Sequence, residues 1–148
     1  MNIVFVCTGN ACRSAAAEAI LKKMVDDHGI EGIEITSCGL HVCDALERDP
    51  MMCAIAAEHG YAMGGNAIPV SVAILINADV VVGMTERHRN LITQLIPYPY
   101  WSKIVLFNEY CFGEPKDLAD PHFQTEYVYR TCFDKIEAGC LQIIKRLL

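Results

Sequence analysis

Residues 3–14 of the chain read Ile3-Val4-Phe5-Val6-Cys7-Thr8-Gly9-Asn10-Ala11-Cys12-Arg13-Ser14. The stretch begins as an unbroken run of β-branched and aromatic residues, which indicates a strand buried on both faces. After a short polar loop, apolar residues recur at helical spacing at Ala16, Ile20 and Met24, up to a stop at Gly29. A strand, a loop and a helix in this order are typical of the first unit of a parallel α/β sheet.

The same alternation continues along the chain. Further strands are expected at 33–36, 79–84 and 103–107. Helices are expected from Asp49-Pro50, from Thr85-Glu86, and along a final apolar stripe, whereas residues 72–77 fit either a helix or a strand. That final stripe comprises Val128, Cys132, Ile136, Cys140, Ile143 and Leu147. We therefore expect an α/β fold in three layers, αβα, with a central, mostly parallel four-stranded sheet in one domain spanning 1–148.

Length and composition fit one folded domain. The chain has 148 residues, of which 53% are hydrophobic and 20% charged, enough apolar material for one core, which excludes disordered and fibrous classes. A net charge of −6 argues against nucleic acid or an anionic membrane surface as a partner. No apolar run approaches a membrane span, and the N-terminal residues carry no export signal. We expect a cytoplasmic monomer.

The eight cysteines and the histidines do not indicate a metal site. The cysteines include no Cys-x-x-Cys pair, and no two histidines stand four residues apart. We expect most cysteines to be buried small apolar residues in a reducing compartment. His41, His88 and His122 are not expected to act as metal ligands or catalytic bases, and residues 86–89 are expected to form the exposed, charged face of a helix.

The loop after the first strand is the candidate site, because ligands of parallel sheets bind beyond the carboxyl ends of the strands. A cysteine at the end of a strand, facing the N-terminus of a helix, is favoured as a thiolate by free N–H groups and the helix dipole. Gly9 and Asn10 tolerate the left-handed backbone that a tight, anion-binding loop needs. Arg13 adds a planar donor for phosphate oxygens, and Ser14 can cap the helix or donate to the Cys7 sulfur. This arrangement places a nucleophile inside a phosphate-binding loop.

The spacing Cys-x5-Arg is not specific by itself. Cys140 and Arg146 show it as well as Cys7 and Arg13. The second match falls inside an amphipathic helix. No strand precedes it and no glycine lies between its cysteine and its arginine, so we expect this second pair to be structural.

The loop sequence at 6–14, together with the late pair Asp120-Pro121, resembles the low-molecular-weight protein tyrosine phosphatase family. The resemblance extends over nearly the whole chain and includes residues 37–39 and 78–85. It implies that Cys7 attacks phosphorus to form a cysteinyl-phosphate, while Arg13 and the loop amides hold the phosphate oxygens.

The resemblance also assigns the acid and the remaining loop residues. Asp120 would protonate the leaving group and then activate water; Asp117 is a nearby competitor without the following proline. No metal or other cofactor is required, because the loop supplies the positive charge. Cys12 would form a reversible disulfide with Cys7 or merely pack beneath the loop. Asn10 would hold the loop's shape, and Ser14 would steady the thiolate. The implied substrate-contacting loop residues are Thr8, Gly9, Asn10, Ala11, Cys12 and Ser14.

The substrate implied by the resemblance is a phosphorylated protein, with phosphotyrosine as the expected residue and phosphoarginine as the alternative. Many family members have an aromatic residue in the loop after the second strand, where this chain has Leu40-His41-Val42-Cys43-Asp44. The expected walls for a tyrosine ring are therefore Leu40, His41 and Phe123. At Ala11, tyrosine-directed members usually have a bulky aliphatic residue and the phosphoarginine branch has threonine.

Two other functions use a similar loop. A thioredoxin-coupled arsenate reductase needs two further relay cysteines, typically just after the middle strand, and residues 84–90 contain none. A phosphocysteine carrier protein would lack a dedicated acid, so Arg13 together with Asp120 argues against it.

Overall fold

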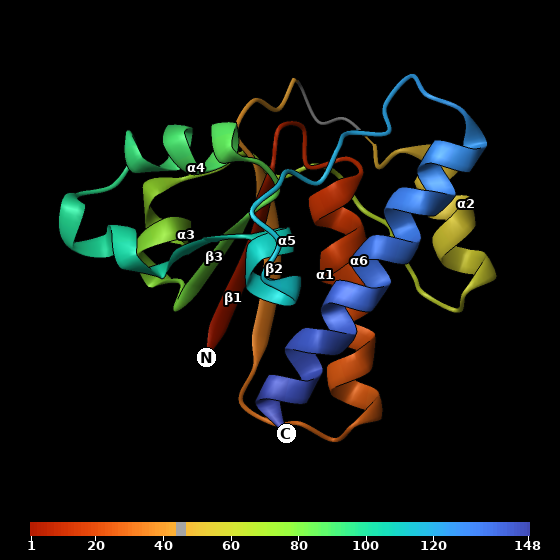
Figure 1. Ribbon diagram of the computed structural model, residues 1–148, viewed down its shortest axis with the longest axis horizontal. Helices are drawn as coiled ribbons and strands as arrows, with labels where there is room; N and C mark the ends of the chain where they lie inside the picture. The colour runs from red at the N-terminus through yellow and green to blue at the C-terminus, as the bar shows by residue number, and fades with distance from the viewer. Residues whose placement is uncertain (44–46) are drawn as a thin grey trace.

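The computed structural model describes residues 1–43 and 47–148 and has a single four-stranded sheet at its centre (Figure 1). The strand order is β2-β1-β3-β4, and every neighbouring pair is parallel. The strands are β1 Asn2–Cys7, β2 Glu34–Gly39, β3 Val80–Gly83 and β4 Ile104–Leu106. The expected α/β sheet of four strands is confirmed.

Helices cover both faces of the sheet. Figure 1 shows α1 and α6 packed side by side on one face, with α3 and α4 on the other. The alternation of β1 explains both cores: Ile3, Phe5 and Cys7 join the core under α1 and α6, whereas Val4 and Val6 join the core under α3 and α4. The helices are α1 Arg13–Asp27, α2 Pro50–Glu58, α3 Val72–Asn77, α4 Glu86–Thr93, α5 Phe107–Phe112 and α6 Glu126–Leu147, with the 3₁₀ helix η1 at Tyr98–Lys103.

Local capping explains where several helices begin. Asp49 accepts hydrogen bonds from the amides of Met51 and Met52 at the start of α2, with Pro50 in the first turn. Thr85 caps α4, as the sequence indicates. The ambiguous segment 72–77 is helix α3, because the Ser71 hydroxyl accepts from the amide of Ile74.

Three local expectations are wrong. Residue Phe107, placed at the end of the fourth strand, begins α5, and neither α5 nor η1 was expected. Helix α1 begins at Arg13 after Cys12, so Ser14 lies inside the first turn and is not the cap. The Ser14 hydroxyl is instead used by Cys7 and Asn10.

The loops at the carboxyl ends of the strands are tied together by backbone hydrogen bonds. The amides of Leu40 and His41 donate to the carbonyls of Cys7 and Thr8, at 3.0 and 2.8 Å. The amide of Leu118 donates to the carbonyl of Met84 at 2.9 Å, which brings the segment before Asp120 to the same edge. In the part of the chain that the structure describes, no helix is both long and apolar enough to cross a membrane.

Candidate active site

Cys7 is the last residue of β1, and its sulfur is held next to a hydroxyl. The side chain is buried, and Sγ lies 2.9 Å from Oγ of Ser14 in the first turn of α1. The side-chain Nδ2 of Asn10 donates to the same Oγ at 2.8 Å. Because the Ser14 oxygen already accepts from Asn10, its own hydrogen is available to the Cys7 sulfur.

Asn10 holds the shape of the loop from behind. It is fully buried and has the left-handed φ of 53° that its residue type tolerates. Its Nδ2 donates to Ser14 Oγ and Ser37 Oγ, each at 2.8 Å, and its Oδ1 accepts from the amide of Ile68 at 2.8 Å. The side chain therefore joins the loop to α1, to β2 and to the segment before α3.

Arg13 and Asp120 meet although they are far apart in the sequence. Arg13 is buried, and its Nη1 donates to the carbonyl of Leu118 at 2.8 Å. Its Nη2 lies 3.6 Å from Oδ2 of Asp120, whose side chain is 49% exposed. The guanidinium thus fixes the acidic segment beside the loop, while the Asp120 carboxyl stays accessible to a ligand.

A cavity of about 350 Å³ opens between the loop and the segments facing it. Asn10 and Ser14 lie behind its wall, whereas Cys7 and Arg13 are on it. Its lining consists of Cys7, Thr8, Gly9, Ala11, Cys12 and Arg13 from the loop and Glu47, Asp49, Pro50, Asp120 and His122 from outside it. The structure therefore brings the sequence-predicted nucleophile, arginine and acid together in one cavity.

The structure does not place Leu40, His41 or Phe123 on the wall of this cavity. The backbone of Leu40 and His41 runs alongside the loop, because their amides are bonded to Cys7 and Thr8. Phe123 has a φ of 62° and is 91% exposed, and its ring packs on the ring of His122 with centroids 3.9 Å apart. The cavity wall opposite the loop is built from other residues.

Three polar residues of that wall, Glu47, Asp49 and His122, were not expected from the sequence. Asp49 caps α2 with Oδ1 and accepts from the Tyr129 hydroxyl with Oδ2 at 2.7 Å, while His122 Nδ1 lies 3.8 Å from the same oxygen. The Asp-Pro start of α2 gave a signal for the cap, but nothing in the pattern indicated that α2 begins at the site.

His88 is the exception to the expected exposed face at 86–89. It is 2% exposed, and its Nδ1 accepts from the amide of Thr85 at 3.2 Å, so the ring hydrogen is on Nε2. Nε2 then donates to Thr8 Oγ1 at 2.9 Å. Burial, helped by the nearby Arg13 charge, lowers the pKa of His88 to about 4, and the ring is neutral at pH 7. This contact orients the Thr8 hydroxyl at the cavity.

The second loop cysteine differs from the first in its surroundings. Cys12 is buried, and burial together with neighbouring Cys132 and Asp49 raises the pKa of its thiol far above the ordinary range. Burial also raises the pKa of Cys132 to about 12. Cys12 is therefore a neutral thiol at pH 7, and its disulfide with Cys7 stays a prediction.

The fold and this loop define a class of α/β phosphatases that carry a cysteine and an arginine in a phosphate-binding loop after the first strand. The chain belongs to the low molecular weight phosphotyrosine protein phosphatase family, whose model matches residues 2–148. The expected family is thus confirmed, and the protein is a hydrolase.

Relatives of this chain carry two kinds of name. It is 29% identical over 147 residues to a protein-arginine-phosphatase of Bacillus subtilis (strain 168), covering 99% of this chain and 97% of the relative. It is 35% identical over 137 residues to the low molecular weight protein-tyrosine-phosphatase PtpB of Staphylococcus haemolyticus, covering 92% of each. The crystal structure of a YwlE mutant from Bacillus subtilis superposes with a TM-score of 0.92 at 28% identity, covering 99% of this chain and 98% of that one.

Proposed function

We propose that this protein hydrolyses phosphorylated protein side chains through a cysteinyl-phosphate on Cys7. The observation that carries the proposal is the 2.9 Å contact between Cys7 Sγ and Ser14 Oγ, in a cavity whose wall also carries Arg13 and Asp120. A nucleophile, an activating donor, an anion-binding cation and an acid are the four groups that such a reaction needs.

In the first step the Cys7 thiolate attacks phosphorus. The S–P bond forms while the bond from phosphorus to the leaving atom breaks, and protonated Asp120 gives its proton to that atom. Arg13 and the loop N–H groups hold the three equatorial oxygens, where charge is spread in the transition state.

In the second step water replaces the sulfur. Asp120, now a carboxylate, takes a proton from the water as its oxygen attacks phosphorus, and the S–P bond breaks to release phosphate and the Cys7 thiolate. The Ser14 hydroxyl stabilises the departing sulfur. The 3.6 Å ion pair with Arg13 keeps the ionised Asp120 over the loop in this second step.

For the substrate, we propose phosphotyrosine. His122 and Pro50 line the cavity opposite the loop, and the ring of Phe123 packs against that of His122 at a tilt of 43°. A phenyl ring can pack against this imidazole and proline, and an aromatic pair of this kind contributes about 0.5–1.5 kcal/mol. PtpB and other relatives are named as tyrosine phosphatases.

Phosphoarginine is the second candidate because the same cavity is acidic. Carboxylates of Glu47, Asp49 and Asp120 line it, and Ala11 leaves room beside the loop. A guanidinium group would be attracted to this wall. The relative of Bacillus subtilis is named a protein-arginine-phosphatase.

The experiment compares kcat/KM on two peptides of the same sequence that carry phosphotyrosine or phosphoarginine. We expect the tyrosine peptide to be preferred; Ala11→Thr should raise the arginine-to-tyrosine ratio and Ala11→Ile should lower it. A wild-type preference for phosphoarginine of a hundredfold or more, about 2.7 kcal/mol, would overturn the tyrosine assignment. If phosphate is released from neither peptide, the proposed phosphatase activity is overturned.

A further inference from the structure

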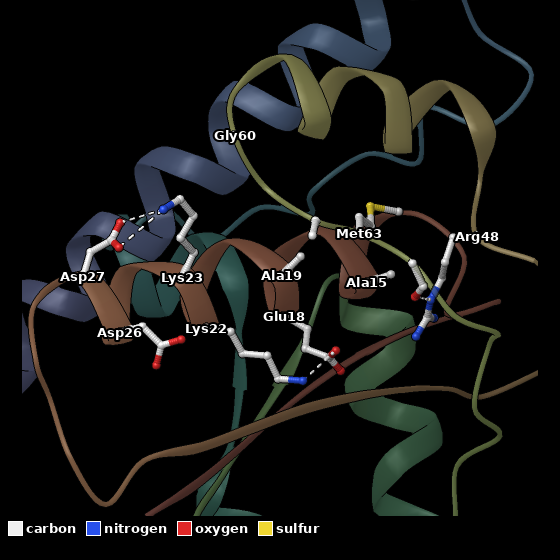
Figure 2. A pocket seen from close by; sticks show the side chains of 12 residues that line it. Ala15, Glu18, Ala19, Lys22, Lys23, Asp26, Asp27, Arg48, Gly60 and Met63 are labelled. Atoms are coloured by element: carbon white, nitrogen blue, oxygen red, sulfur yellow. Dashed lines mark hydrogen bonds and ion pairs between the residues drawn. The ribbon is translucent and has the colours of Figure 1, made fainter.

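Arg48 is a buried cation that the proposed reaction does not use. It lies just before α2 and is 8% exposed. Its Nη1 donates to both oxygens of Asn10, the backbone carbonyl and, at 2.7 Å, the side-chain Oδ1. Its Nε donates to the carbonyl of Gly64 at 3.2 Å. Figure 2 shows the side chain beside α1, at the groove that α1 forms with residues 60–64.

The contact with the Asn10 carbonyl has a consequence for the next amide. In a trans peptide the C=O of one residue and the N–H of the following residue point in opposite directions. Arg48 holds the Asn10 carbonyl on the side of the groove, so the N–H of Ala11 is turned the other way. Ala11 lines the active-site cavity, whereas Arg48 does not.

The contact with Oδ1 completes the bonding of the Asn10 side chain. Its Nδ2 uses both hydrogens on Ser14 and Ser37, and Oδ1 accepts from Ile68 and Arg48. An αL backbone is unfavourable for a residue other than glycine, so a strong, charged donor on both oxygens of Asn10 favours that conformation.

The charge of Arg48 is also directed at the loop. Its hydrogen-bond partners in the described part of the chain are neutral oxygens of Asn10 and Gly64. A buried positive charge that is not neutralised by a contacting carboxylate attracts an anion in the adjoining cavity more strongly than an exposed one.

We infer that Arg48 is a positioning residue of the phosphate-binding loop: it turns the Ala11 N–H toward the bound phosphoryl group and supports the anion electrostatically from behind. The inference rests on the proposed function only for the nature of the anion.

The test uses Arg48→Gln, which removes the charge, and Arg48→Lys, which keeps the charge but lacks the Nε–H that donates to Gly64 and holds the guanidinium plane in place. Lys23→Met is the matched control, because Lys23 lines the same groove but, among the described residues, forms its ion pair with Asp27. Binding of inorganic phosphate and vanadate is measured by calorimetry, and alkylation of Cys7 by iodoacetate is measured against pH.

We expect Arg48→Gln to weaken phosphate and vanadate binding about tenfold or more, which is about 1.4 kcal/mol. The pH midpoint of Cys7 alkylation should move upward, Arg48→Lys should be intermediate, and Lys23→Met should match the wild type. A purely structural residue would lower the melting temperature without moving the alkylation midpoint.

The inference would be overturned if, in both Arg48 variants, the dissociation constants for phosphate and vanadate stay within twofold of the wild type and the pH midpoint of Cys7 alkylation does not move. If Arg48→Gln does not fold, the Arg48→Lys result decides. A wild-type protein that binds phosphate in an Arg48-dependent manner but hydrolyses neither phosphopeptide would leave the inference standing and defeat the proposed function.

Discussion

The chain contains the spacing Cys-x5-Arg at 7–13 and again at 140–146, and the structure gives the two copies different surroundings. Cys7 ends a strand, contacts Ser14 and lines a cavity with Arg13. Cys140 is fully buried inside α6, where its thiol lies 3.7 Å from the carbonyl of Ala17 in α1. The difference shows that the loop backbone creates the site, because it brings the two side chains to one cavity.

The second copy has a packing role. Burial raises the pKa of the Cys140 thiol well above its ordinary value. Arg146 is turned away and lies over the ring of Tyr110, 4.4 Å from its centroid. Next to Cys140, a Cβ built on Gly139 would stand 2.3 Å from the Phe107 ring, so this stretch of α6 packs closely against α5.

The largest expected contrast is between Cys7→Ser and Cys140→Ser. Loss of the nucleophile should lower kcat by more than about 10⁴-fold, while vanadate binding persists because the loop amides and Arg13 remain. Cys140→Ser should keep kcat and lower the free energy of unfolding by about 1–3 kcal/mol, because a hydroxyl is then buried beside α1. Steady-state rates and urea unfolding measure both; substantial turnover by Cys7→Ser would rule out covalent catalysis.

Substitution of the two arginines, Arg13 and Arg146, should affect kcat/KM to very different extents. Arg13→Ala removes the cation that faces the transferred phosphoryl group and should lower kcat/KM by about 10³–10⁵-fold, the span for arginines that stabilise such charge. Arg146→Ala removes a contact with Tyr110 on the far side of the fold from the loop's cavity lining and should leave kcat/KM within about twofold. Equal losses in the two variants would show that Arg13 acts through stability alone.

The acid should show its role through the leaving group. Asp120→Asn should lower kcat by about 10²–10⁴-fold for a poor leaving group and much less for a good one, which hardly needs a proton. Asp117→Asn is the matched control, since Asp117 accepts from the Glu86 amide through an oxygen that asparagine keeps. A loss with Asp120→Asn that is the same for both leaving groups would indicate a structural role.

The smallest expected effect concerns the contact between His88 and Thr8, which lies in the loop that carries Cys7 and Arg13. The pKa of His88 is lowered from 6.5 to about 4 by burial, so between these values the unfolded chain binds a proton that the native protein does not. The free energy of unfolding should therefore fall as pH is lowered through this window, by up to about 3 kcal/mol, and should be fully retained above it.

Urea unfolding at several pH values between 7 and 4 measures this slope, with His88→Asn as the control that lacks the titrating ring. The variant is expected to be less stable at pH 7 but to have a shallower dependence on pH. Identical slopes in the two proteins would mean that His88 is not the group responsible.

The sequence was informative wherever local periodicity or residue chemistry determines structure. The strands, the loop after β1 and the apolar stripe of α6 follow from such patterns, and Cys7, Arg13 and Asp120 do meet in one cavity. The expected ring walls Leu40, His41 and Phe123 lie elsewhere. Side-chain direction outside helices and strands has no period, so it depends on tertiary contacts.

Arg48 is a residue of the loop's surroundings that the sequence patterns did not predict. Nothing in the neighbouring sequence marks it, since its partners Asn10 and Gly64 are brought to it only by folding. The charged run at 86–89 likewise predicts an exposed His88, because a run of polar residues does not reveal that one position of the helix turns toward the loop.

Trapping the intermediate tests the central claim most directly. The Asp120→Asn variant is mixed with an aryl phosphate that has a good leaving group, quenched within milliseconds and digested for mass spectrometry. We predict that one phosphate is found on Cys7 and none on Cys140. Continued turnover with no phosphorylated Cys7, or phosphate on a different residue, would contradict the account.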